Sequence, residues 1–460
     1  MILTGRVQDR LDHPMLGSAL NPLTLEPVPG KPPVGMPYLD GSFGTIITRI
    51  AEAKNADPQQ AILKPMYSTM QAWNAGEGTE GESILLLWDR SRGHVLYNGE
   101  YPYNFLSVLP IAPTDIEHVV WDPVEPFVLY YPTQKNQGRC QLLKVTLKPA
   151  YKEEVYFDFS AAPVNAPITA PRNRFGFGRD PEIPTLGPRK IIGLCAGTDG
   201  EIKIVYSIAE NKVLSHFKYA HPEWVAIAPV VTPSEQRIYM GGGYVFGMDW
   251  AFQRRLAASF YYEHSQIGAN LAGDTWNAIA FDPSSPGAND SGTLVTHDLA
   301  TGKARVILGP STGWPYPASG THISACGPTG WVLVSSVGSA HNGQNFGDNE
   351  ITLANTDTGE FYRVGHTRTW AGTNCGPESN QCPSGYFGES HGCISRKGNR
   401  FLFGSDGLGF TGLPFKSVDP FVGNLDKGLV EVRVKHLAGV KSLSPFQPHD
   451  AHLEGYEVVV

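Results

Sequence analysis

The sequence has few charged residues, few cysteines and no long hydrophobic run. Charged residues make up 17% of the 460, and 44 acidic against 36 basic side chains leave a net charge of -8. Because no basic stretch is available to neutralise phosphates, the composition argues against a nucleic-acid partner. No apolar run approaches the roughly 20 residues that a membrane-spanning helix needs, so we expect no membrane partner either.

The six cysteines are too few to form a disulfide-stabilised scaffold in a chain of this length. Cys140 and Cys195 lie in strand-like runs, and we expect both to be small buried hydrophobes. The N-terminal stretch MILTGRVQDRLDHPMLG has no apolar segment of the kind found in signal peptides. Two interpretations stay open, a cytoplasmic protein or one whose numbering starts after a removed leader. We expect the second, with a secreted or periplasmic location.

Short apolar runs, rich in β-branched and aromatic residues, fill the sequence. Examples are SILLLWD, PFVLYYP, QLLKVTL, IKIVYSI and RFLFGSD, with Gly, Pro, Asn and Asp clusters between such runs. Runs of this kind are typical of β-strands separated by turns, and no segment keeps a helical period for long. The sequence therefore predicts an all-β fold. A content of 41% hydrophobic residues is enough to fill a large core.

One hairpin pattern recurs along the chain, in WDRSRGHVLYNG, THDLATGKARVILG and ANTDTGEFYRVG. Each copy has a strand that ends near an Asp, a turn that closes on Gly, and a second strand, with the glycine supplying a positive φ. Units recurring at intervals of roughly 40 to 70 residues are typical of four-stranded propeller blades. We expect residues 1–460 to form a single seven-bladed β-propeller domain with long loop insertions, and to be a monomer. The stretches GTIITRI and YEVVV are expected to complete one shared blade.

His or Arg lies at or near the start of several expected blades. In a propeller the innermost strands start near the central channel, so side chains that are distant in sequence would converge there. A single histidine at such a place can also simply satisfy a backbone carbonyl. Its repetition favours a site for an acidic ligand, a metal ion, or both. The residues concerned are His118, Arg179, His221, His264, His322 and His391.

A second pattern lies near the C-terminal end of the chain. His366, Cys375, Cys382 and His391 follow one another with eight, six and eight residues between them. Two thiolates and two imidazoles can form a tetrahedral structural zinc site, which would order a loop that has no apolar core of its own. A disulfide between the two cysteines, or free thiols, are the alternatives. Our prediction is zinc, with His391 assigned to it.

Several phrases resemble the seven-bladed β-propeller polysaccharide lyases, which include oligogalacturonate, ulvan and rhamnose–glucuronate lyases. The phrases are FGTIITRI, YSTMQAWNA, GTHISA, GWVLVSS, FYRVGHTR and ESHGCISRKGNRFLFGSD. The resemblance implies an enzyme that cleaves a uronic-acid-containing polysaccharide by β-elimination in the central channel. It also implies an acidic polysaccharide as the partner, and it allows Ca²⁺ or Mn²⁺ as a further cation.

The resemblance extends to single residues. Arg179 is similar to the arginine that neutralises the substrate carboxylate in ulvan-type enzymes, and His118 is similar to one of their catalytic histidines. His221, His264 and His322 are similar in spacing to the catalytic and metal-binding histidines of oligogalacturonate lyases. The expected substrate contacts are Asn98, Arg174, Trp224 and Tyr261. No tyrosine aligns well with the family's base before Arg179, so the alternative function is a non-catalytic propeller that binds a glycan or a protein.

Overall fold

The computed structural model describes residues 28–40, 43–56, 61–168, 174–179, 181–219, 221–257, 262–280, 293–309, 321–336, 349–369, 385–407, 410–411 and 417–425. These residues form 30 β-strands and two short 3-10 turns, η3 (Pro222–Trp224) and η6 (Gly385–Gly388), and no α-helix occurs among them. The predicted all-β class is therefore confirmed. In the described residues no helix has the length and hydropathy needed to cross a membrane. Tyr261, Cys375, Cys382 and the YEVVV stretch lie outside these ranges.

Four sheets have four strands each, in sequence order. The first has β8 (Val120–Trp121), β9 (Val128–Thr133), β10 (Gln141–Thr146) and β11 (Lys152–Asp158). The second has β15 (Val230–Val231), β16 (Arg237–Met240), β17 (Tyr244–Gly247) and β18 (Phe252–Arg255). The third has β19 (Tyr262–Asn270), β20 (Gly273–Ala280), β21 (Thr293–Asp298) and β22 (Ala304–Leu308). The fourth has β23 (His322–Ser324), β24 (Trp331–Ser335), β25 (Glu350–Asn355) and β26 (Phe361–His366).

The remaining strands form three further sheets. A three-stranded sheet contains β12 (Ile191–Ala196), β13 (Ile202–Ser207) and β14 (Lys212–Lys218). A nine-stranded sheet contains β2 (Pro37–Asp40), β3 (Thr45–Arg49), β4 (Ala61–Lys64), β5 (Ile84–Asp89), β6 (Gly93–Asn98), β7 (Phe105–Val108), β27 (Cys393–Ile394), β28 (Arg400–Ser405) and β30 (Ser417–Asn424). A small parallel pair joins β1 (Val28–Pro29) to β29 (Phe410–Thr411).

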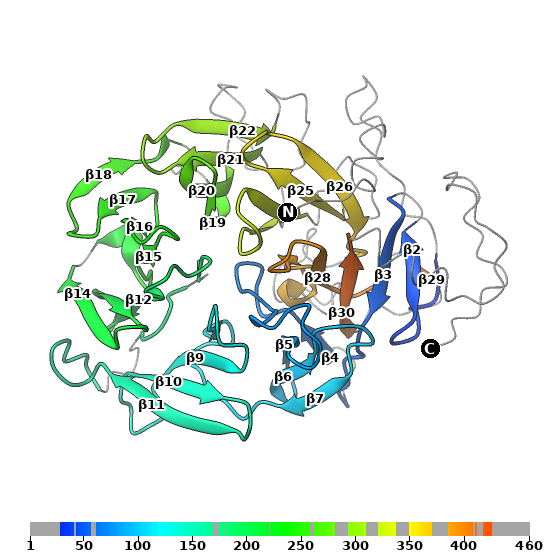
Figure 1. Ribbon diagram of the computed structural model, residues 1–460, viewed down its shortest axis with the longest axis horizontal. Helices are drawn as coiled ribbons and strands as arrows, with labels where there is room; N and C mark the ends of the chain where they lie inside the picture. The colour runs from blue at the N-terminus through cyan, green and yellow to red at the C-terminus, as the bar shows by residue number, and fades with distance from the viewer. Residues whose placement is uncertain are drawn as a thin grey trace.

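The sheets stand side by side around a common centre, with β9 and β19 nearer to it than β11 and β22 (Figure 1). Every residue of β9 and of β28 is buried, whereas β7 is exposed along its whole length. A strand whose two faces are both covered by neighbouring sheets is apolar along its length rather than alternating. This packing explains why β9 and most of β28 are apolar runs. The arrangement of the sheets is propeller-like.

The recurring hairpin pattern has a common physical basis. Asp89 accepts hydrogen bonds from the backbone N–H groups of Ser91 and Arg92, and the turn between β5 and β6 closes on Gly93 with φ of 79°. The β21–β22 and β25–β26 turns close in the same way on Gly302 and Gly359, with φ of 77° and 83°. An acceptor side chain that starts the turn, followed four residues later by a left-handed glycine, fixes the register of each hairpin.

Strands from the two ends of the described chain share one sheet. β3 pairs antiparallel with β30, and β30 pairs antiparallel with β28 (Figure 1). β30 also pairs in parallel with β4, through Ser417 beside Ala61 and Val418 beside Ile62. The GTIITRI stretch therefore pairs with a late strand of the chain, and the YEVVV stretch expected to share its blade lies outside the described residues. The partner in the described residues is β30.

A buried ion-pair group connects β28 to the segments around β5. The guanidinium of Arg400 donates to Glu77 at 2.9 Å and to Glu100 at 2.8 Å, and it lies over the ring of Trp73 at 5.3 Å. Arg400 and Glu77 are each only 2% exposed. Because both charges are removed from water, neither is stable here without the other.

We predict that Arg400→Met lowers the free energy of unfolding by about 3–5 kcal/mol, because it leaves the Glu77 carboxylate buried without its cation. Denaturant unfolding of wild type and variant measures the difference. Lys218→Ala is the matched control, since Lys218 is 74% exposed and its ion pair with Glu201 lies at the surface. Equal losses in the two variants would contradict a structural role for the buried group.

Candidate functional site

Three histidines from neighbouring sheets lie in contact near the centre of the molecule. His264 lies in β19, His322 begins β23, and His391 comes two residues before β27. The ring centroids of His264 and His322 are 4.3 Å apart, and those of His322 and His391 are 4.1 Å apart. The fold thus brings together three imidazoles that are widely separated in sequence.

The backbone around His391 is constrained. His391 has φ of 42°, in the left-handed region that residues other than glycine rarely adopt. A Cβ on the following Gly392 would lie 2.8 Å from the Cβ of Ser335, so β27 can approach β24 this closely only with glycine there. Unusual backbone of this kind is often found where a side chain must be aimed at a site.

A carboxylate lies between two of these histidines. The Oε2 atom of Glu389 is 2.7 Å from Nε2 of His322 and 3.6 Å from Nε2 of His391. One ligand atom from each of the three residues lies within 4.8 Å of the others. Two imidazoles and one carboxylate at such distances are a donor set that suits a divalent transition metal.

The protonation of the two histidines also fits a metal site. Burial, and then the positive charge of neighbouring groups, holds the pKa of His322 and of His391 well below the usual 6.5. Both imidazoles are therefore neutral at physiological pH, as metal ligation requires. Nδ1 of His322 is buried and has no hydrogen-bond partner among the described residues.

Lys64 supports His391 from the far side of the ring. Its ammonium nitrogen hydrogen bonds with Nδ1 of His391 and donates to the backbone carbonyl of Glu389 at 3.0 Å. Lys64 is only 1% exposed. Burial lowers its pKa to about 7, although the carboxylates of Glu389 and Glu117 oppose the shift. An amine that ionises near neutral pH is therefore part of the histidine cluster.

A cavity of about 360 Å³ opens beside His264. Tyr67 lines it, and the Tyr67 ring centroid lies 5.0 Å from that of His391 and 5.5 Å from that of His322. Nδ1 of His264 is 2.8 Å from the backbone carbonyl of Thr321, so this nitrogen carries the hydrogen and the lone pair lies on Nε2. The other polar side chains of the lining are Thr69, Arg179, Glu182, Tyr239, Tyr262 and Ser265.

Arg179 enters this cavity from an irregular segment, and His118 holds that segment in place. Nε2 of His118 is 2.8 Å from the carbonyl oxygen of Gly178, and Nδ1 is 2.8 Å from the hydroxyl of Thr114. A Cβ on Gly176 would lie 2.3 Å from Nδ1 of His118. Arg179 itself is exposed. His118 therefore positions the Arg179 segment and does not line the cavity.

His221 and Trp224 belong to a different cavity. Their rings lie 4.8 Å apart and help to line a cavity of about 470 Å³ together with Tyr219, Tyr244 and Phe252. Nδ1 of His221 accepts a hydrogen bond from the N–H of Glu223 at the start of η3. Neither His221 nor Trp224 lines the cavity beside His264.

The other expected site residues have local roles where the structure describes them. Asn98 accepts a hydrogen bond from the N–H of Glu100 in the turn after β6. Arg174 is exposed, and its backbone N–H donates to Gly197. Neither lines the cavity beside His264.

His366 and His391, which we assigned to one zinc site, have different partners. Nδ1 of His366 lies 3.1 Å from the buried carboxylate of Asp40. Burial alone would raise the pKa of Asp40, but His366 and then Arg368 hold it down to about 2. His391 instead faces His322 and Glu389, so its assignment to the Cys2His2 set does not match its described contacts.

Several polar residues of the site were not among those predicted from the sequence. Glu389 precedes His391 by two residues in ESHGC, and a Glu-x-His pair at a strand start would have been a signal for metal ligation. Lys64, Tyr67 and Glu182 carry no such signal, because each is a single residue in an apolar or loop segment whose neighbours in space are distant in sequence.

No family model matches the sequence, and no curated protein matches it either. Among solved structures, the chain is similar to an oligogalacturonate lyase in complex with manganese, with 12% sequence identity and a TM-score of 0.51. The match covers 88% of this chain and 100% of that one. At this identity the likeness shows the fold alone, and it agrees with the propeller-like arrangement of the sheets.

The depressed pKa of Lys64 predicts a pH-dependent stability. Between about pH 7 and pH 10 the unfolded chain binds a proton at Lys64 that the folded chain does not, so this residue's contribution to stability rises with pH. The free energy of unfolding of wild type minus that of Lys64→Met should therefore increase across this window. Denaturant titrations at several pH values measure it. A Lys64 difference that stays flat across this window would contradict the lowered pKa.

Proposed function

We propose that the chain is a seven-bladed β-propeller polysaccharide lyase that cleaves a uronic-acid-containing glycan by β-elimination. The described strands support seven blades if β4–β7 form one blade and β2, β3, β27, β28 and β30 form another, beside the five smaller blade sheets. The observation that carries the function is the cluster of His264, His322, His391 and Glu389 at the edge of a cavity that also holds an arginine.

Elimination at a uronate has three requirements. The negative charge of the substrate carboxylate must be neutralised so that the neighbouring C5 proton becomes acidic, a base must remove that proton, and the departing glycosidic oxygen must be protonated. Arg179 is suited to the first requirement, because a guanidinium binds a carboxylate through two parallel hydrogen bonds. It is exposed and lines the cavity, so it is accessible to a polymer.

His264 is the residue best suited to remove the C5 proton. Its hydrogen bond to Thr321 keeps the proton on Nδ1, which leaves the Nε2 lone pair as the basic site. Of the three phenols that line the cavity, Tyr67 is 2% exposed and Tyr239 is 1% exposed, whereas Tyr262 is partly exposed. Tyr262 is therefore the candidate that protonates the leaving oxygen.

His322, Glu389 and His391 would hold a divalent cation, and Mn²⁺ is the first candidate because the solved oligogalacturonate lyase structure contains manganese. When bound, such an ion supplies further positive charge for the substrate carboxylate. Lys64 would keep the His391 ring in place through its contact with Nδ1. This proposal replaces zinc in the Cys2His2 set, and Ca²⁺ is less suited to two imidazoles.

A secreted or periplasmic location and a monomeric state remain part of this proposal. An acidic polysaccharide is the expected partner, and a cavity lined by Arg179 and histidines can accept it although the chain carries a net charge of -8.

The reaction predicts an unsaturated uronate product that absorbs in the ultraviolet. The substrates to test are a panel of polyuronides. His264→Ala should lower kcat by about 10² to 10⁴-fold, because it removes the general base. His221→Ala is the control and should keep near wild-type activity, since His221 lines the other cavity. If no polyuronide gives the product while Arg179→Ala abolishes glycan binding, the chain is a binding protein instead.

The metal site predicts a separate result that does not need substrate. Wild type should bind Mn²⁺ in equilibrium dialysis. Both His322→Ala and Glu389→Gln should weaken this binding by more than about 10-fold, because mutating a residue that only supports a metal ligand already causes a loss of roughly that size. His366→Ala is the matched control, because His366 contacts Asp40 and not this cluster. Elemental analysis that finds zinc lost in His366→Ala would favour the Cys2His2 site.

A further inference from the structure

Two buried cysteines from neighbouring sheets lie side by side. Cys326 follows β23, which begins with His322, and Cys393 begins β27, two residues after His391. Their sulfur atoms are 3.8 Å apart. A disulfide has a sulfur–sulfur distance of about 2.05 Å, so the two sulfurs would have to move about 2 Å closer to form one.

The surroundings of the two thiols differ. Cys326 is 5% exposed and Cys393 is 0% exposed, so only the first has any contact with solvent. The Cys393 thiol donates to the carbonyl of Met70 at 3.1 Å, whereas the Cys326 sulfur lies 3.6 Å from the side-chain amide nitrogen of Gln71. The neighbouring Cys393 sulfur and the Ser324 hydroxyl lower the pKa of Cys326.

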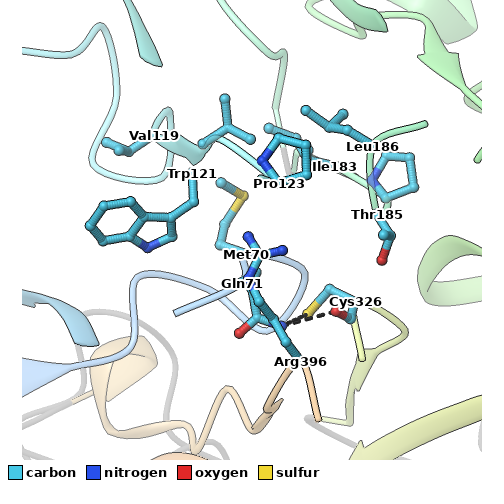
Figure 2. Close-up of a pocket in the computed structure, with 12 residues that line it drawn as sticks. Met70, Gln71, Val119, Trp121, Pro123, Ile183, Thr185, Leu186, Cys326 and Arg396 are labelled. Carbon is cyan, nitrogen blue, oxygen red and sulfur yellow. Dashed lines mark hydrogen bonds between the residues drawn. The ribbon is translucent and has the colours of Figure 1, made fainter. Parts of the chain in front are cut away.

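Cys326 lines a small pocket together with Gln71 and Arg396. Figure 2 shows the Gln71 amide bonded to Cys326, with Arg396 beside them and Met70, Trp121 and Ile183 around the opening. The pocket has a cavity volume of about 30 Å³. That is room for about one water molecule, so a small oxidant fits better than a peptide thiol or glutathione.

We propose that Cys326 and Cys393 form a peroxide-oxidised disulfide site. The Cys326 thiolate attacks one oxygen of hydrogen peroxide, the O–O bond breaks, and the products are a Cys326 sulfenic acid and hydroxide. The Cys393 sulfur then attacks the Cys326 sulfur and forms the S–S bond. The hydroxyl group of the sulfenic acid leaves and takes up the Cys393 proton, which gives water. Two thiols are oxidised in total, and one peroxide is reduced to two molecules of water.

The disulfide would link the segments that carry two of the cluster histidines. Cys326 lies four residues after His322, and Cys393 lies two residues after His391. The bond would close a loop of 67 residues and restrain both strands at their inner ends. This inference does not depend on the lyase proposal, because it concerns thiol chemistry that can be measured without any glycan.

Peptide mapping of the full-length protein after hydrogen peroxide treatment tests the proposal. We expect Cys326 and Cys393 to lose alkylation together and to appear as one cross-linked peptide pair that dithiothreitol releases. Cys140 and Cys195 should stay alkylatable after denaturation, since both are buried and neither has a disulfide partner among the described residues. A Cys375→Ser/Cys382→Ser background shows that the pair forms without exchange from those cysteines.

The single variants separate the two steps. In Cys393→Ser, dimedone should label Cys326 as a sulfenic acid, whereas in Cys326→Ser it should not label Cys393. Sulfoxide at Met36, which is 38% exposed, reports that the peroxide dose was sufficient. The proposal is overturned if Met36 is oxidised while Cys326 and Cys393 both remain free thiols in the wild-type protein.

Discussion

The site depends on how the sheets are arranged, and the pairing of β3 with β30 stabilises that arrangement. Through it, strands from the two ends of the described chain lie in the same sheet, and β30 extends the sheet further to β4. The other sheets stand side by side around the same centre (Figure 1), and three histidines from neighbouring sheets lie in contact. The Arg400 group adds to this restraint, because it ties β28 to Glu77 and Glu100 through buried charges.

Burial of polar groups gives the cluster its chemical character. His322 and His391 are each at most 1% exposed, they share the Glu389 carboxylate, and Lys64 contacts His391. In such a setting charged forms are unfavourable unless they are paired, so the imidazoles are neutral and Lys64 loses its proton near pH 7. Neutral nitrogen ligands beside a carboxylate are what a divalent cation needs. The adjacent cavity provides space for a ligand of a few hundred cubic ångströms.

The dithiol and the histidine cluster lie at and beside the same two strands, β23 and β27. β23 and the segment before β27 carry His322 and His391 at their starts, and Cys326 and Cys393 lie shortly after them. A covalent link between the sulfurs would therefore act on the backbone that holds the candidate metal ligands. Candidate metal ligands and oxidisable thiols thus lie within a few residues of each other on these segments.

The fold class could be predicted from the sequence, because apolar runs of strand length and the Asp-to-Gly hairpin turns are local signals that read directly as β-structure. The importance of His264 and His322 could be inferred from their positions at strand starts. The sequence could not reveal that Glu389, Lys64 and Tyr67 join them, that His118 supports a loop, or that His221 lines another cavity. Those partners are set by packing between sheets. Some of these contacts, such as Lys64 with His391, join residues more than 300 positions apart, for which no local pattern exists. The sequence by itself determined the strands and their turns, and only the tertiary structure decided which side chains share a site.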